Sequence, residues 1–210
     1  MLFVCVNSFA QTKYEFDYYT VYEFRTNKQD SVFTKDITIA NSKNSNYFIK
    51  ISTSANNTGR ICFYDLDRNE SYNFAFNGKI NPDTDFDSLF KTPVPYYFNL
   101  NLLRKKAVDK YDVIYHDNEI IIRRYKNRRK KKIVSDYHLV MESNDIAKNQ
   151  IYTSDIIFAY KFDINKIKTN KIIKESFLIK YEKSSEKKKE NIRVLKDIQP
   201  IDFKLDIPKK

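Results

Sequence analysis

Hydrophobic and polar residues alternate with a period of two in several stretches of this chain, and the longest is residues 13–25, KYEFDYYTVYEFR. This is the periodicity of a β-strand, because successive side chains of a strand point to opposite faces. A helix would scatter the same rings around its whole circumference. The stretch therefore predicts one long antiparallel strand with a mostly aromatic face, which consists of Tyr14, Phe16, Tyr18, Thr20, Tyr22 and Phe24.

Shorter segments of similar composition follow, separated by turns rich in Asn, Asp and Ser. The segment 156–164 also fits helical spacing, but its aromatic and β-branched content favours a strand. The first two strands are expected to form a hairpin. The further strands that we expect are residues 32–40, 47–52, 61–66, 72–76, 111–116, 119–125, 133–142, 156–164, 177–181, 192–195 and 201–207.

Residues 79–101 interrupt this rhythm. Asp85 or Asp87 can cap a short helix through residues 88–90, and Pro93 and Pro95 prevent regular ladder pairing. We expect a long connection across an edge or the mouth of the sheet, and ordered loops of this length often carry function.

The composition fits one globular domain. Of the 210 residues, 41% are hydrophobic and 15% aromatic, which is enough for a core, and only two glycines and five prolines argue against a linker. The predicted fold of residues 11–210 is mainly β. It is a single antiparallel, strongly curved sheet or open half barrel of about ten strands, with at most one or two short helices.

The first ten residues, MLFVCVNSFA, are typical of the end of a secretory signal peptide, with Ser8 and Ala10 at the small-residue positions. The basic part of such a signal is missing, so a first strand is the alternative. Val4 is too large to precede a lipidated Cys5, which argues against a lipid anchor. After cleavage Cys62 stands alone, and no other segment is long and apolar enough for a transmembrane helix.

The chain carries a formal charge of +11, and its densest basic run lies between two expected strands. A basic hairpin of this kind can contact lipid headgroups, lipopolysaccharide or another polyanion. Only Tyr125 is interleaved with the cations, so sequence-specific nucleic-acid binding is not expected. A solvated hairpin tip that blocks aggregation is the other interpretation. The candidate anion-binding residues are Arg123, Arg124, Lys126, Arg128, Arg129 and Lys130.

Catalytic and metal-binding signals are weak. His116 and His138 each share a strand face with an aspartate, which leaves a hydrolase as a remote alternative. Two histidines without further ligands make a poor zinc set. Residues 65–70 imitate the start of a calcium loop but lack its glycine and its glutamate, so a polar turn is the simpler interpretation. We predict no catalytic residues, metal or cofactor.

The aromatic faces remain as the candidate site. Most of these rings must form a core, but a concave sheet lined by tyrosines can also hold an acyl chain or another apolar ligand. The candidate ligand-binding residues are Tyr14, Phe16, Tyr18, Tyr22, Phe24, Phe74, Phe158 and Tyr160.

Four features of the layout resemble a known group of proteins. They are the terminal SFAQ cleavage site, the Tyr- and Phe-rich first strand, the successive antiparallel strands and the closing strand IDFKLDIPKK. In this layout the chain resembles small exported β-rich envelope proteins of the GLPGLI group, which are similar in outline to the half-barrel lipoprotein carriers related to LolA. The GLPGLI signature itself is absent, so no functional residue is transferred. The resemblance implies a curved sheet in the periplasm or outside the cell.

These observations predict an exported, non-enzymatic envelope protein that binds an apolar or lipidic ligand or a protein partner. An anion-binding surface module that uses residues 123–132 is the alternative.

Overall fold

The computed structural model describes residues 11–26, 34–54, 58–77, 86–90, 96–99, 110–126, 132–146, 177–186 and 189–208. These residues form a single antiparallel sheet and one short helix, which confirms the predicted mainly β fold. The sheet has eleven strands in the order β6-β5-β4-β3-β2-β1-β11-β10-β9-β8-β7, and it is open, with β6 and β7 at its edges. The elements are β1 (Gln11–Thr26), β2 (Thr34–Ala40), β3 (Tyr47–Ser54), β4 (Thr58–Asp65), β5 (Glu70–Asn77), α1 (Phe86–Leu89), β6 (Tyr96–Asn99), β7 (Lys110–His116), β8 (Glu119–Tyr125), β9 (Ile133–Ser143), β10 (Phe177–Glu186) and β11 (Lys189–Pro208).

Neighbouring strands of the sheet are also neighbours in the sequence, except at the centre, where β1 pairs with β11. The expected hairpin of the first two strands is confirmed, because β1 pairs antiparallel with β2. Asn69 and Asp117 lie in tight turns and have positive φ angles of 58° and 40°. Asn and Asp tolerate this backbone conformation better than other residues with a side chain, so the turns form where the sequence supplies them.

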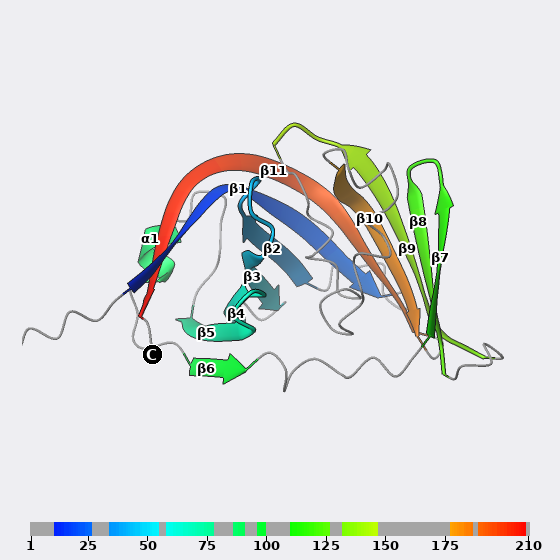
Figure 1. Cartoon of the computed structure of the whole chain (residues 1–210), viewed down its shortest axis with the longest axis horizontal. Coiled ribbons are helices and arrows are strands. Elements are labelled where there is room, and N and C mark those ends of the chain that lie inside the picture. The colour runs from blue at the N-terminus through cyan, green and yellow to red at the C-terminus, as the bar shows by residue number, and fades with distance from the viewer. Residues whose placement is uncertain are drawn as a thin grey trace, which may run out of the picture.

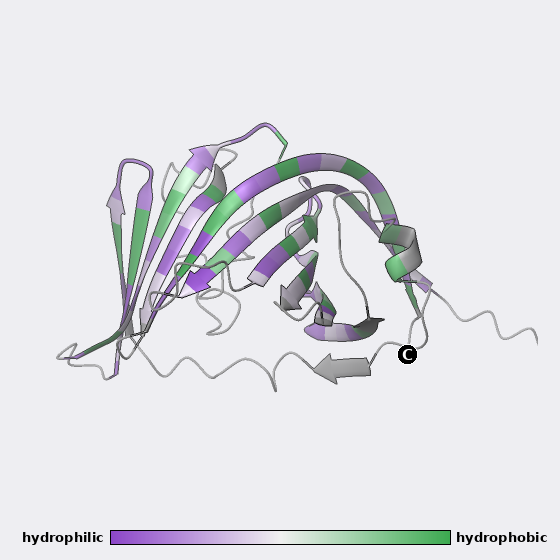
Figure 2. Cartoon of the chain, turned by 180° about the vertical axis from the view of Figure 1, so that it is seen from behind, coloured by the Kyte–Doolittle hydropathy of each residue, from purple (hydrophilic) through white to green (hydrophobic). Residues whose placement is uncertain are grey.

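The two central strands are also the longest, and they arch side by side over the rest of the sheet (Figure 1). Hydrophilic and hydrophobic bands alternate along both of them (Figure 2). Their ladder is irregular between Phe16 and Tyr18 and again between Val21 and Tyr22. Such irregularities bend strands and increase their twist, which accounts for the arch.

The prediction of separate strands at 192–195 and 201–207 is wrong, because β11 runs through both segments without a break. Pro200 lies within this strand and has no N–H group for the ladder. It pairs with Tyr18, directly beside the first irregularity, where a missing donor is tolerated.

The prediction of one continuous aromatic face on β1 is also wrong. Tyr14, Phe16 and Tyr19 all belong to the main core, whereas Tyr18 packs in a separate cluster. The alternation therefore changes phase at Asp17. The carboxylate of Asp17 accepts hydrogen bonds from the backbone N–H of Ser42, at 2.7 Å, and from its hydroxyl. Tyr18, Tyr22 and Phe24 consequently lie on the opposite face of the sheet from Tyr14 and Phe16, and Tyr19 lies on the face of the main core.

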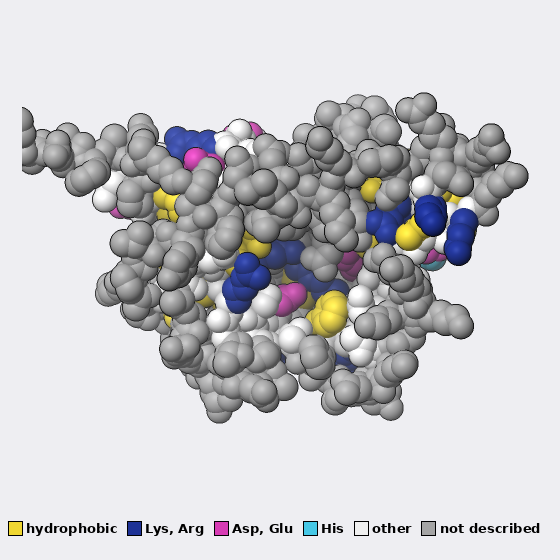
Figure 3. Space-filling model, turned by 90° about the horizontal axis from the view of Figure 1, so that it is seen from below, with side chains coloured by type: hydrophobic (Ala, Val, Ile, Leu, Met, Phe, Trp, Pro, Cys, Tyr) yellow, Lys and Arg dark blue, Asp and Glu magenta, His cyan; other side chains and the backbone are white. Residues whose placement is uncertain are grey.

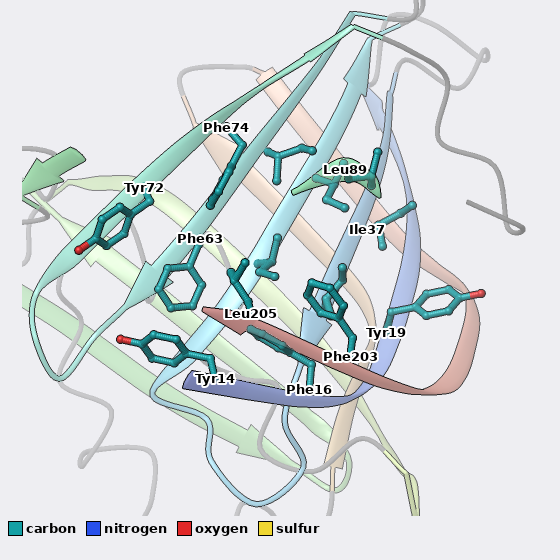
Figure 4. Packing of buried hydrophobic residues seen from close by; sticks show 14 of the residues in the cluster. Tyr14, Phe16, Tyr19, Ile37, Phe63, Tyr72, Phe74, Leu89, Phe203 and Leu205 are labelled. Carbon is teal, nitrogen blue, oxygen red and sulfur yellow. The ribbon is translucent and has the colours of Figure 1, made fainter. Parts of the chain in front are cut away.

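The main core is built from aromatic rings of β1, β4, β5 and β11 and from isoleucines of β2 to β4 (Figure 4). The ring of Phe203 stacks on that of Phe16, with 5.5 Å between centroids. Phe90, directly after α1, packs edge-on against Phe74 at 5.0 Å and lies 5.2 Å from Phe203. The short helix thus closes the core, which accounts for the buried Leu89.

The predicted connection 79–101 contains α1, which lies two residues earlier than expected, and β6. Sequence reasoning missed β6, which begins directly after Pro95 and pairs with β5. An edge strand suits this position, since it needs ladder partners on one side only. The expected strand at 156–164 and the expected signal segment at 1–10 lie outside the described residues. Within the described parts of the chain, no helix has the length and apolar character needed to cross a bilayer.

Candidate ligand-binding face

A buried charged pair lies at the centre of the sheet, on the face opposite the main core. The guanidinium of Arg193 lies 3.6 Å from the carboxylate of Glu182, and both side chains are at most 4% exposed. Arg193 also lies over the ring of Tyr22, 3.7 Å from its centroid, and donates a hydrogen bond of 3.4 Å to the hydroxyl of Thr38. These contacts place the four side chains on one face of the sheet, which we call the arginine face.

Tyr22 links β1 to β10 across the intervening β11. Its hydroxyl donates a 2.8 Å hydrogen bond to the backbone carbonyl of Ile179. The carbonyl lies beside a register shift between Ile179 and Tyr181, where the ladder is disturbed. Burial raises the pKa of Tyr22, because tyrosinate loses its hydration there. Tyr22 therefore remains a neutral hydrogen-bond donor. Tyr22 and Arg193 together connect the four neighbouring strands β2, β1, β11 and β10.

Towards β8, the arginine face becomes apolar. Leu139 pairs with Glu182 on one side and with Ile120 on the other, so the three side chains share the arginine face. Met141 pairs with Ile179, and Tyr137 with Ile122, next to them. All of the apolar members are buried. We call this group the apolar strip, and it consists of Ile120, Ile122, Tyr137, Leu139, Met141 and Ile179.

Towards β4, the arginine face is polar at one end, whereas the buried cluster of Tyr18, Ala40 and Phe48 occupies the other end. Thr38 pairs with Thr20 and with Lys50, and Arg60 lies diagonally beside Lys50 on the next strand. Lys50 is half-buried and Arg60 is exposed. Seen from below, the molecule has a hollow in which Lys and Arg side chains gather beside acidic and hydrophobic ones (Figure 3). The arginine face thus joins a basic region to an apolar strip, with Arg193 between them.

The structure divides the predicted aromatic site between the two faces. Tyr14, Phe16 and Phe74 pack in the main core, and Tyr18 packs in the cluster with Ala40 and Phe48. Tyr22 is fully buried on the arginine face, and Phe24 is half-buried on β1. Phe158 and Tyr160 lie outside the described residues. Whether any of these rings binds a ligand stays a prediction.

The predicted basic hairpin is described only at its base. Arg123 pairs with Asp136 at 3.7 Å, Arg124 is buried, and Lys126 is exposed. Arg128, Arg129 and Lys130 lie outside the described residues. Arg124 does not contribute to an exposed anion-binding surface, because its side chain is only 6% exposed.

The ring of His138 lies between two carboxylates on the opposite face of β9 from the apolar strip. Nδ1 is 3.0 Å from Glu119, and Nε2 is 3.4 Å from Asp136. Ser135 lies on the other face, as the alternation predicts, so it cannot serve as a nucleophile beside His138. His116 is exposed. In the described part of the chain, no set of three or more His, Cys, Asp and Glu side chains is placed to hold a metal.

The turn that imitates a calcium loop has a structural role. The carboxylate of Asp65 accepts a 2.6 Å hydrogen bond from the hydroxyl of Tyr14 and a 2.9 Å bond from the backbone N–H of Arg68. Burial and the hydrogen bond to Asp65 both raise the pKa of Tyr14. These contacts tie the turn between β4 and β5 to the first strand.

Comparison of the chain with protein-family models and with curated proteins finds no match. Sequence reasoning also missed Glu182 and Arg193, the charged residues at the centre of the arginine face. Only Arg193 has a sequence signal for burial, because it lies between the aliphatic residues Ile192 and Val194 within an expected strand.

Proposed function

We propose that this protein is a non-enzymatic, exported envelope protein that binds a lipidic ligand on the arginine face. The observation that carries the proposal is the apolar strip on β8 to β10, which is separate from the main core and on the opposite face of the sheet. The strip is itself buried, with every member at most 5% exposed, so the proposed ligand lies within the fold and not on an open surface. The leader-like residues 1–10 and the layout of the chain support the envelope location.

The chemistry of the strip fits an acyl chain better than a polar substrate. Its isoleucine, leucine and methionine side chains present no hydrogen-bonding groups, and methionine adapts to flexible apolar ligands. Burying one methylene group contributes about 0.8 kcal/mol, so several methylenes of an acyl chain are enough for stable binding. The charged pair of Arg193 and Glu182 lies at one end of the strip, where it faces the polar end of the proposed ligand.

Native mass spectrometry of gently purified full-length protein tests this function. We expect a population whose mass exceeds that of the chain by one lipid, and a second population without it after mild delipidation. Re-addition of a lysophospholipid should restore the heavier species. Protein that never carries or takes up a lipid contradicts the proposal, and a stoichiometric bound protein instead would support the partner-binding interpretation.

The same preparation can locate the ligand. Met141→Glu places a carboxylate in the apolar strip and should abolish lipid uptake, whereas Ile133→Glu changes an exposed side chain at the start of the same strand. Circular dichroism must show that both variants keep the sheet. Equal lipid uptake by folded Met141→Glu protein would exclude the strip as the binding site.

A further inference from the structure

The sheet is divided between β10 and β11 over part of their length. The two strands pair from Tyr181 with Val194 to Glu186 with Lys189. Beyond that ladder, residues 177–180 of β10 follow β9, and residues 195–200 of β11 follow β1. In the described part of the chain, no ladder joins these two segments. We call the gap in the ladder between residues 177–180 and 195–200 the split.

A β-bulge lies on each side of the split. Lys180 is the extra residue of β10 in its ladder with β9, because Ile179 and Tyr181 pair with adjacent residues of that strand. Lys196 is the extra residue of β11 in its ladder with β1. Bulges bend the strand that contains them, so the two bends account for the end of the ladder between β10 and β11.

The charged side chains at the split contact the strands on either side of it. Lys180 forms an ion pair of 2.8 Å with Glu142 of β9, and Lys196 forms one of 3.2 Å with Glu23 of β1. Both lysines are exposed. Neither ion pair crosses the split, so separation of the two segments leaves both pairs intact.

A hydrogen bond from Tyr22 crosses the split. Its hydroxyl donates at 2.8 Å to the backbone carbonyl of Ile179, which has a ladder partner on β9 only. On the other side of the split, the backbone N–H of Ile198 donates at 2.8 Å to the carboxylate of Asp197. A side chain of β1 thus holds the edge of β10 at the point where β11 no longer pairs with it.

We propose that the sheet opens at the split, with Tyr22 as its latch, and that this opening is the route to the buried apolar strip. Ile179 lies at the edge of the split and is fully buried, and its partner Met141 is 2% exposed. Separation of the two segments breaks no ladder of the described strands and uncovers both side chains. The route for a ligand rests on the proposed function, whereas the opening itself does not.

Cysteine labelling of the full-length protein measures the opening. Met141→Cys places a thiol beside the split, and Cys62, which is 4% exposed and lies on β4, is the internal reference. A maleimide reacts with both thiols, and peptide mass spectrometry reads each rate separately. Each rate is divided by the rate of the same thiol in urea-unfolded protein. We expect the thiol at position 141 to be less protected than Cys62.

Tyr22→Phe removes the latch and should accelerate labelling at position 141 without changing Cys62. Loss of one hydrogen bond changes an equilibrium by about two- to tenfold, so the acceleration should lie in that range. Tyr47→Phe is the matched control, because the hydroxyl of Tyr47 also donates to a backbone carbonyl, that of Glu15, at 2.9 Å. This control should leave labelling at position 141 unchanged.

Three results would overturn the inference. Equal acceleration of both thiols in Tyr22→Phe would indicate global unfolding in place of a local opening. An unchanged rate at position 141 in that variant would exclude Tyr22 as the latch. The same acceleration in Tyr47→Phe would show that the effect is not specific to the split.

Hydrogen exchange of proteins without the added cysteine gives a second test. Amides of residues 177–181 and 195–199 should exchange faster in Tyr22→Phe than in the wild-type protein, and those of residues 203–207, which pair with the start of β1, should not change. Equal exchange of the first two segments in both proteins would overturn the opening. A lysophospholipid that fails to slow labelling at position 141, while the opening persists, would contradict the proposed lipid binding and not the opening.

Discussion

Replacing Arg193 with methionine should unfold the centre of the sheet more readily than any exposed substitution. The change leaves the carboxylate of Glu182, 4% exposed, without the cation that lies 3.6 Å away. At this distance and an effective dielectric constant of about 20, the attraction between the two charges is about 5 kcal/mol. Breaking a buried pair by removing one partner typically costs about 3–5 kcal/mol, which agrees with that value.

The ring contact and the hydrogen bond are lost with the charge. Arg193 lies 3.7 Å from the centroid of Tyr22 and donates to Thr38, so the upper part of the range is expected. For a domain of this size, a loss of about 3–5 kcal/mol lowers Tm by roughly 6–20 °C. Urea unfolding followed by far-ultraviolet circular dichroism should show a lower midpoint with an unchanged slope.

The double variant Glu182→Leu/Arg193→Met distinguishes a charge effect from lost packing. Hydrophobic replacement of a whole buried pair is often neutral, so the double variant should recover at least about 2 kcal/mol relative to Arg193→Met alone. A cost below about 1 kcal/mol for Arg193→Met, or a double variant as unstable as the sum of the two single variants, would refute the reasoning.

Three further substitutions probe the same architecture. Phe203→Ala removes the ring that stacks on Phe16 and should cost about 3–5 kcal/mol in urea unfolding; an unchanged midpoint would show that α1 and β11 do not form the core. Tyr14→Phe removes the donor to buried Asp65 and should cost about 1.5–3 kcal/mol by the same assay, and a neutral effect would contradict the structural role of that turn. Because burial raises the pKa of Tyr22 above its ordinary value of 10.0, the unfolded chain binds fewer protons than the folded chain above that pH. Stability should therefore fall as the pH rises above 10.0, and it should fall less steeply in Tyr22→Phe; equal slopes in the two proteins would contradict the burial of this hydroxyl.

Most of the strands were predictable because they have a period-two pattern that the local sequence shows, whereas β6 lies in the segment read as a connection and was missed. The turn at Asp117 and the hairpin of β1 and β2 followed from the same reasoning. The pattern failed at Asp17, since a polar residue there looks like an ordinary solvent-facing position. Its change of phase depends on Ser42 and on β11, which are distant in the sequence.

The candidate site was less predictable than the fold. Glu182 and Arg193 occupy positions in β10 and β11 where a charged residue normally indicates the solvent face. Their burial arises only when β1 and β2 bring Tyr22 and Thr38 against them from more than 150 residues away. No local pattern predicts that these residues come into contact, because the register of the central strands depends on two irregularities in their ladder.

Methyl NMR of isoleucine-labelled protein tests the central claim most directly, because the two faces of the sheet carry different isoleucines. Titration with a lysophospholipid should shift the methyl signals of Ile120, Ile122 and Ile179 on the arginine face. The signals of Ile49, Ile51 and Ile61 in the main core should remain in place. Shifts confined to the core isoleucines, or no shifts at saturating lipid, would contradict ligand binding on the arginine face.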